Sequence, residues 1–161
     1  MMPLLNTKGR DLFYEGEAAM EIRIGSLIPV VNEKNNRKLN ESSLHRFLLE
    51  LPFYPTAALA DYIVWKEIDA QTARGILTYK GITAEADFFF DQSGNLIRQE
   101  ALRYHGSDEQ AERIPCIAEI TAYSSIEGLQ IPREATITWM LADGPFTWYK
   151  LTIADIQIER Y

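Results

Sequence analysis

Apolar and polar residues alternate with a period of two along most of this chain. In EAAMEIRIGS (17–26) the apolar side chains from Ala18 to Ile24 point one way and the charged side chains point the other way. This pattern is typical of a half-buried antiparallel strand. The same alternation, broken by turn residues, predicts about eight strands in total. They are expected at 17–26, 61–69, 73–79, 82–90, 95–105, 113–124, 129–141 and 146–159.

Short turn sequences separate these segments, which favours antiparallel hairpins. The reversals are expected near 69–72, 80–81, 91–94, 127–128 and 143–144. The polar stretch VVNEKNNRKLN is expected to be a loop. In the last strand the apolar phase changes between Ile153 and Ile156, and this indicates a bulge near Ala154 and Asp155.

Residues 40–51 have the period of an amphipathic helix instead of a strand. Asn40 is expected to cap its start, with Glu41 at the positive end of the helix dipole, and Pro52 is expected to end it. Two prolines then enclose a pair of aromatic residues. One helical face collects Leu44, Phe47, Leu48 and Leu51. The pattern therefore predicts a one-sided helix that covers an apolar surface.

The order of these elements predicts a single domain over residues 1–161 of the mainly β (α+β) class. We expect a strongly curved antiparallel sheet, or half-barrel, of about eight strands wrapped around the helix at 40–51. Several carriers of apolar ligands share such an architecture, which is an analogy between folds and does not establish a ligand.

Composition narrows the range of partners. Sixteen basic and twenty-three acidic residues give a net charge of −7, which disfavours nucleic acid because phosphate is repelled. No window is long and apolar enough for a signal peptide or a membrane span. The default expectation is therefore a cytoplasmic protein without a direct membrane span.

The residues that carry chemistry in enzymes are sparse here. Cys116 lies in an alternating apolar stretch and is interpreted as a core thiol. His45 and His105 lack the neighbouring ligand pattern of a metal site, and Glu85 and Asp87 fall on the expected solvent face of their strand. We therefore assign no catalytic residue, no metal and no cofactor. A hydrolase or isomerase that uses His105 with a nearby carboxylate is kept as a third hypothesis.

The expected inner faces are rich in aromatic residues, as the linings of small-molecule pockets are. Arg98 and Arg103 lie on opposite faces of one strand, so one of them must approach the inner side. There it could bind an acidic ligand headgroup or form an internal salt bridge to Glu100 or Glu119. The candidate cavity lining is Phe47, Leu51, Phe53, Tyr54, Trp65, Phe88, Phe90, Arg98, Arg103, Trp139 and Tyr149.

Several motifs together resemble an uncharacterised bacterial family that is known only as a domain of unknown function. They are GEAAMEIRIGSLIPV, HRFLLELPFYPTAAL, VWKEID, FFFDQSGNLI with Arg103 and Tyr104, and GLQIPREATITWMLADGPFTWYKLTIADI. The resemblance runs from about residue 15 to 161 and implies no activity. It also implies that many members carry an upstream block, so this chain is expected to be a short member or the C-terminal part of a longer architecture. In the latter case an unpaired edge near residues 12–24 would invite a homodimer.

Two main hypotheses follow. In the first, the protein is a non-enzymatic binding module that holds a hydrophobic or lipid-like small molecule beneath the helix. In the second, it is a structural or regulatory interaction domain with a solid core and no ligand. A cavity filled by Phe53, Tyr54 and the helix side chains would favour the second hypothesis.

Overall fold

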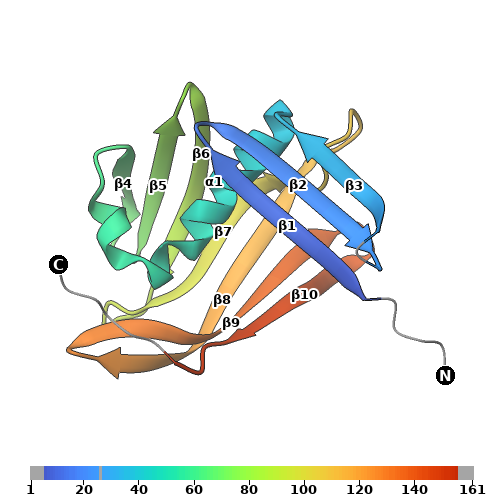
Figure 1. Cartoon of the computed structure of the whole chain (residues 1–161). Helices are drawn as coiled ribbons and strands as arrows, with labels where there is room; N and C mark the ends of the chain where they lie inside the picture. The colour runs from blue at the N-terminus through green and yellow to red at the C-terminus, as the bar shows by residue number, and fades with distance from the viewer. Residues whose placement is uncertain (1–5, 26, 156–161) are drawn as a thin grey trace.

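The computed structural model describes residues 6–25 and 27–155 (Figure 1). Its strands are β1 (Thr7–Tyr14), β2 (Glu17–Ile24), β3 (Ile28–Lys34), β4 (Ile63–Asp69), β5 (Thr72–Tyr79), β6 (Ile82–Phe90), β7 (Leu96–Tyr104), β8 (Arg113–Ile126), β9 (Leu129–Leu141) and β10 (Gly144–Thr152). Its helical elements are the α-helix α1 (Arg37–Glu50) and two 3-10 segments, η1 (Leu51–Phe53) and η2 (Pro55–Leu59). The described part of the chain is therefore mainly β, as the alternation predicted.

The strands form two antiparallel sheets, whereas the sequence predicted one. The first sheet has the order β1-β2-β3, and the second has the order β10-β9-β8-β7-β6-β5-β4. Within each sheet the strands pair with their neighbours in sequence because the connections are short. Within the described residues β4 and β10 are the two edges of the larger sheet and do not pair with each other, so this sheet is not a closed barrel.

The prediction missed strands β1 and β3. The stretch that was interpreted as a polar loop instead begins within β3, which pairs with β2 from Ile28 to Lys34. Both strands lie at the edges of a small sheet and are mostly exposed. A strand without a buried face has no reason to alternate apolar and polar residues, so its periodicity carries no signal.

The helix also begins earlier than predicted. Asn36 caps it, and its side-chain oxygen accepts hydrogen bonds from the amides of Lys38 and Leu39. Asn40, the predicted cap, is a buried residue of the first turn, and its Oδ1 accepts a hydrogen bond of 2.7 Å from the amide of Ala18 in β2. Both asparagines suit an N-cap, and the contact with β2 decides between them.

The prediction of a one-sided helix is wrong for a related reason. Helix α1 contacts β6 and β7 of the large sheet and also β2 of the small sheet (Figure 1). The small sheet binds Asn40, and the large sheet binds Glu41 through Arg113 and Ser42 through Arg103, so polar positions that the sequence assigned to solvent are buried. The buried polar residues of the helix are Asn40, Glu41, Ser42, Ser43 and His45.

The helix ends close to the predicted position. Its last residue is Glu50, and Pro52 and Pro55 lie at the starts of η1 and η2. A proline ring fits the first turn of a helix but removes an amide donor from its interior. The two prolines therefore divide the exit from α1 into two short turns before β4 begins.

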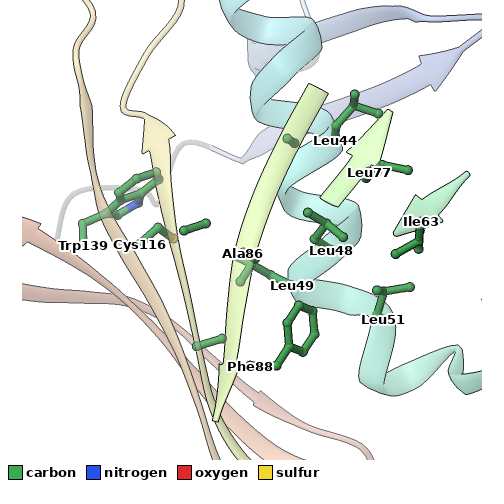
Figure 2. Packing of buried hydrophobic residues seen from close by; sticks show 13 residues of the cluster. Leu44, Leu48, Leu49, Leu51, Ile63, Leu77, Ala86, Phe88, Cys116 and Trp139 are labelled. Carbon is green, nitrogen blue, oxygen red and sulfur yellow. The ribbon is translucent and has the colours of Figure 1, made fainter. Parts of the chain in front are cut away.

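Apolar side chains from α1 pack directly on the large sheet. Figure 2 shows Leu48 and Leu49 of the helix beside Ala86 and Phe88 of β6. Leu48 is completely buried, and its carbonyl oxygen accepts a hydrogen bond of 3.0 Å from Nε2 of Gln99 in β7. The contact surface between helix and sheet is thus apolar, with one buried amide that has a partner.

An ion pair ties the start of α1 to β8. The guanidinium of Arg113 donates to both carboxylate oxygens of Glu41, at 2.7 and 2.8 Å. Glu41 is buried, while about half of the Arg113 side chain is exposed. A two-bond pair of this kind holds both groups in one orientation.

We expect the substitution Arg113→Met to lower the free energy of unfolding by about 1–3 kcal/mol, because the buried carboxylate of Glu41 loses its partner. Denaturant unfolding at neutral pH would measure the change. Arg74→Met is the matched control, since Arg74 forms the same two-bond pair with Asp87. The Asp87 side chain is more exposed than that of Glu41, 25% against 10%, and a loss of at most about 1 kcal/mol is expected. Equal losses for the two variants would contradict the role of burial.

Several local predictions are confirmed. The reversals at 80–81, 91–94 and 127–128 lie between consecutive strands. In β6, Ala84, Ala86 and Phe88 are buried while Glu85 is exposed, and Cys116 is a buried free thiol. These features depend only on neighbouring residues and on the period of the strand, which a sequence displays directly.

Candidate functional site

A pocket of about 470 Å³ opens between the end of α1 and the strands β7 to β10. One wall consists of the last turn of the helix and η1, and the other consists of four consecutive strands (yellow to red in Figure 1). Its volume falls within the range of small-molecule sites, about 300–1,000 Å³. The pocket is the best candidate for a functional site because most of its lining is apolar.

The register of the strands determines the lining. Gln99 of β7 pairs with Ala118 of β8, which pairs with Ile137 of β9, which in turn pairs with Tyr149 of β10. These four side chains form one row across the sheet. Because side chains on one face recur every second residue, Ile120, Ala135 and Leu151 form the next row. The two small alanines leave the space that the pocket occupies.

A bulge in β10 adds a second aromatic ring to this wall. Thr147 pairs with Thr138 and Tyr149 pairs with Ile137, so Trp148 is the extra residue between them. A bulge breaks the alternation of side chains, and both Trp148 and Tyr149 line the pocket. Their rings lie 5.3 Å apart between centroids.

The predicted bulge near Ala154 and Asp155 is therefore misplaced. Strand β10 ends at Thr152, and residues 153–155 follow it without strand structure. Ile156 and Ile158, which carried the predicted change of phase, lie outside the described residues. The prediction looked for a place where the apolar residues move from one face of the strand to the other. The observed bulge gives no such signal, because Trp148 and Tyr149 are adjacent aromatic residues that fit either face.

The helix contributes two rings and an arginine to the opposite wall. Phe53 and Tyr54 follow Pro52 and line the pocket, and more than half of the Tyr54 side chain remains exposed. Arg46 forms ion pairs with Asp11 of β1 and, at 3.3 Å, with Glu50. The charge of Arg46 is thus compensated by two carboxylates, one of which, Glu50, also lines the pocket.

Arg103 is the second cation of the lining. Its Nε donates a hydrogen bond of 2.8 Å to Oγ of Ser42 in α1, and its guanidinium lies 5.5 Å from the centroid of the Trp139 ring. Among the described residues, no aspartate or glutamate forms an ion pair with Arg103. It is therefore a charged group on the helix side of the sheet whose partners are a hydroxyl, an aromatic face and the Cys116 thiol.

Burial lowers the pKa of Arg103 from its ordinary value, and the nearby guanidinium of Arg46 lowers it further. The pKa of the neighbouring Cys116 thiol is raised by burial, an effect that the charge of Arg103 opposes. An arginine keeps its proton under such conditions. The position therefore carries a positive charge that is poorly solvated, and the carboxylate that acts on it, Asp11, forms its ion pair with Arg46 instead.

Comparison with known protein families identifies the family of this chain. The sequence model described as "Family of unknown function (DUF6920)" matches residues 1–158. The chain belongs to the DUF6920 family. The match confirms the resemblance inferred from the motifs and extends it to the first residue.

Neither the curated proteins nor the solved structures compared with this DUF6920 chain include a significant match. The family description assigns no activity. The geometry of the pocket is therefore the basis for inferring a function of this chain.

Four of the predicted lining residues meet at the pocket of this DUF6920 chain, namely Phe53, Tyr54, Arg103 and Tyr149. The structure places the other predicted residues elsewhere. Leu51 and Phe88 belong to the core, Phe47 and Phe90 pack against the edge of that core, and Trp139 lies under Arg103. Prediction by strand face alone did not separate the core from the open space next to it.

Trp65, which is 38% exposed, packs on the core residue Phe88. Their rings meet edge to face at 4.8 Å above Gly75 of β5, where an added Cβ would lie 3.1 Å from both rings. The Trp65 Nε1 also donates to the carbonyl oxygen of Ala58 in η2. These rings occupy the space left by a glycine and do not border the pocket.

Arg98 and Arg103 have the opposite placements that their strand predicted. Arg98 forms a partly exposed ion pair with Glu100 on the other face of the sheet and stacks on Phe89. The internal salt bridge that was the alternative for the inward arginine is not formed by Arg103 among the described residues. Arg103 lies on the side of the helix and the pocket. The sequence could not choose between them because both positions are flanked by apolar residues.

The prediction missed several lining residues: Arg46, Leu49, Glu50, Pro52, Gln99, Ala118, Ile120, Ala135, Ile137, Trp148, Leu151 and Ile153. Many of them are small or aliphatic residues that look the same in a core and in a pocket. The sequence showed that these residues alternate with polar ones. It did not show that no side chain packs against them from the other wall of the pocket.

Three further features of the described residues concern metals, membranes and His105. Within residues 6–25 and 27–155, no three side chains of His, Cys, Asp or Glu converge in a way that could hold a metal ion. Among the helices in the same residues, none has the length and hydropathy needed to cross a membrane. His105 contacts the Trp139 ring edge to face at 4.9 Å.

Proposed function

We propose that this protein is a non-enzymatic binding module for a hydrophobic, lipid-like small molecule. The observation that carries the proposal is the pocket of about 470 Å³ between α1 and β7 to β10, with its mainly apolar lining. In this proposal the large sheet acts as a half-barrel around the helix, and the ligand occupies the space that the core leaves empty.

The distribution of side chains supports such a role. Beside the pocket, the core between helix and sheet is closely filled by leucines and by Phe88. At the pocket, Ala118 and Ala135 stand where larger residues would complete the packing. Burying apolar ligand surface there would contribute about 25 cal/mol for each Å² removed from water. Rings from Trp148, Tyr149 and Tyr54 border the same space and offer flat apolar contacts.

The test is binding of a fluorescent apolar probe together with native mass spectrometry of the purified protein. In the variant Ile120→Trp the larger ring is expected to fill the pocket and weaken probe binding by about tenfold or more. The matched control is Ile97→Trp, which makes the same change at an exposed position of β7 outside the pocket. Circular dichroism would show whether both variants keep the strand content of the parent.

The proposal predicts a co-purifying apolar molecule or probe binding that Ile120→Trp abolishes and Ile97→Trp leaves unchanged. Probe binding that is insensitive to Ile120→Trp, or equally sensitive to Ile97→Trp, would place the apolar contact elsewhere. No binding of any apolar probe would refute the proposal.

A structural or regulatory interaction domain is the second candidate, favoured by the small sheet. Strands β1 and β3 are the edges of that sheet in the described residues, and exposed apolar side chains such as Leu12, Ile28 and Val30 lie on them. Unpaired edges with apolar residues can pair with another chain, which includes a second copy of this one. Sedimentation at several protein concentrations would detect a homodimer, and a charged substitution such as Leu12→Lys would be expected to dissociate it.

A further inference from the structure

The pocket has one cationic end and one apolar end. In the strand register Arg103 pairs with Ile114, and the next row on the same face contains Cys116 and Trp139. The rows that line the pocket follow after that, so Arg103 lies at one end of the pocket. Arg46 of α1 also contributes there, as its effect on the pKa of Arg103 indicates. From this end the rows continue with Gln99 and Tyr149 and then become aliphatic.

The spacing of the apolar rows follows from the strand geometry. Along β8 the pocket is lined by Ala118 and Ile120, whereas Ile114 does not line it and Cys116 belongs to the core, so at about 3.3 Å for each residue the two rows lie about 7 Å apart. Ile120, Ala135 and Leu151 form the far row. A pocket of about 470 Å³ that is bordered by these rows can hold a single hydrocarbon chain.

Arg103 is the group at the cationic end that lacks a counter-ion. Arg46 is neutralised by Asp11 and Glu50, and Arg98 and Arg113 have Glu100 and Glu41. Of these four arginines, only Arg103 has no carboxylate partner among the described residues. Its guanidinium interacts with the Ser42 hydroxyl and the Cys116 thiol, and a thiol is only a weak acceptor. The fork therefore holds no carboxylate, and its nitrogens are the donors that bind a carboxylate or phosphate in pairs.

We propose that the ligand is a single-chain amphiphile with an anionic headgroup that binds Arg103, while its hydrocarbon chain lies along β8 to β10. This inference rests on the proposed function and specifies the ligand class. An anion at Arg103 would neutralise a charge that burial and Arg46 destabilise. Glu50 also lines the pocket and repels an anion, but it is paired with Arg46.

The experiment compares ligands that share one chain and differ only at the headgroup. Dodecanoate, dodecyl phosphate and dodecanol would be titrated into the full chain at neutral pH by calorimetry. Dodecanoate or dodecyl phosphate is expected to bind about 10- to 100-fold more tightly than dodecanol, because bonds between charged groups are stronger than those of a neutral hydroxyl. The tighter of the two anions identifies the headgroup.

Two variants assign the effect to one side chain. Arg103→Met is expected to remove the preference for the anion, weakening its binding about 10- to 100-fold while dodecanol binding stays within about twofold. Arg98→Met is the matched control from the same strand, because Arg98 is paired with Glu100 and does not line the pocket, and it should bind all three ligands as the parent does.

The outcomes separate the two proposals. If dodecanol binds as tightly as both anions, the pocket binds apolar molecules but the anionic headgroup is refuted, and this comparison requires no variant. If the anions bind more tightly but Arg98→Met weakens them as much as Arg103→Met does, the contact is not at Arg103 and the inference fails. If none of the three ligands binds, the proposed function itself fails.

Discussion

Replacing Leu48 with alanine is expected to lower the free energy of unfolding by about 3–5 kcal/mol. Leu48 has no exposed surface and lies between α1 and the large sheet (Figure 2). Its removal both forfeits the burial of the side chain and leaves a cavity, because Leu49, Ala86 and Phe88 are held by their own contacts and cannot fully collapse. Denaturant unfolding monitored by tryptophan fluorescence would measure the change.

Leu59→Ala is the control for this prediction. It is the same chemical change in η2, at a side chain that is 88% exposed, and it should change the free energy of unfolding by no more than about 0.5 kcal/mol. A loss below about 1 kcal/mol for Leu48→Ala would mean that the packing between helix and sheet does not carry the stability assigned to it.

The second large effect is on the pH dependence of stability. Burial lowers the pKa of His45 from 6.5 to about 4, and the positive charges of Arg103 and Arg113 lower it as well. Glu41 acts in the opposite direction, through its carboxylate and through its carbonyl oxygen, which lies 3.1 Å from Nδ1 of His45. Burial outweighs Glu41, so the ring is neutral in the folded protein at neutral pH.

The direction of the effect follows from the two protonation states. Above pH 6.5 His45 is neutral in both the folded and the unfolded chain and makes no contribution to the pH dependence. Between pH 6.5 and about 4 the unfolded chain binds a proton that the folded chain excludes, so the free energy of unfolding falls as the pH falls. The total loss by pH 4 is on the order of 3 kcal/mol.

The variant His45→Gln isolates this contribution because glutamine does not titrate. Unfolding free energies of the parent and the variant would be measured at several values between pH 8 and pH 4. The difference at pH 8 gives the cost of the substitution itself, and the expected result is that the variant loses less stability than the parent on acidification. Parallel curves across this range would show that His45 is not excluded from protonation by the fold.

The strands of the large sheet were predictable because their signal is local. Each of them has one face against the core, so alternation appears in the sequence, and turn residues such as Lys80 and Gly81 mark the reversals. The end of the helix was predictable for the same reason, since Pro52 acts on its immediate neighbours. In both cases the physical cause extends over only a few residues.

The start of the helix and the small sheet were not predictable in this way. Asn36 and Asn40 are equally good caps by residue type, and the hydrogen bond between Asn40 and Ala18 joins residues that are far apart in the chain. Other long-range contacts, of Glu41 with Arg113 and of Ser42 with Arg103, hold further buried polar residues of α1. Which helix residues are buried depends on the distant segments that pack against the helix. The period of the helix sequence does not contain that information.

The candidate site was also predictable only in part. The sequence indicated that an arginine of β7 would reach the inner side and that Phe53 and Tyr54 would follow the helix. It did not indicate which arginine, or that Trp148 would join Tyr149 through a bulge. Nor did it distinguish aromatic residues that fill the core, such as Phe88 and Trp139, from those that border empty space.

By itself, therefore, the sequence determined the class of fold, most strand positions, the end of the helix and the membership of the DUF6920 family. Tertiary structure alone decided that two sheets enclose the helix, that Arg103 lacks a carboxylate partner, and that a pocket remains beside a filled core. The reason is physical: periodicity records whether a side chain is buried, but a cavity and an unpaired charge depend on what stands opposite, and that is set by residues from distant parts of the chain.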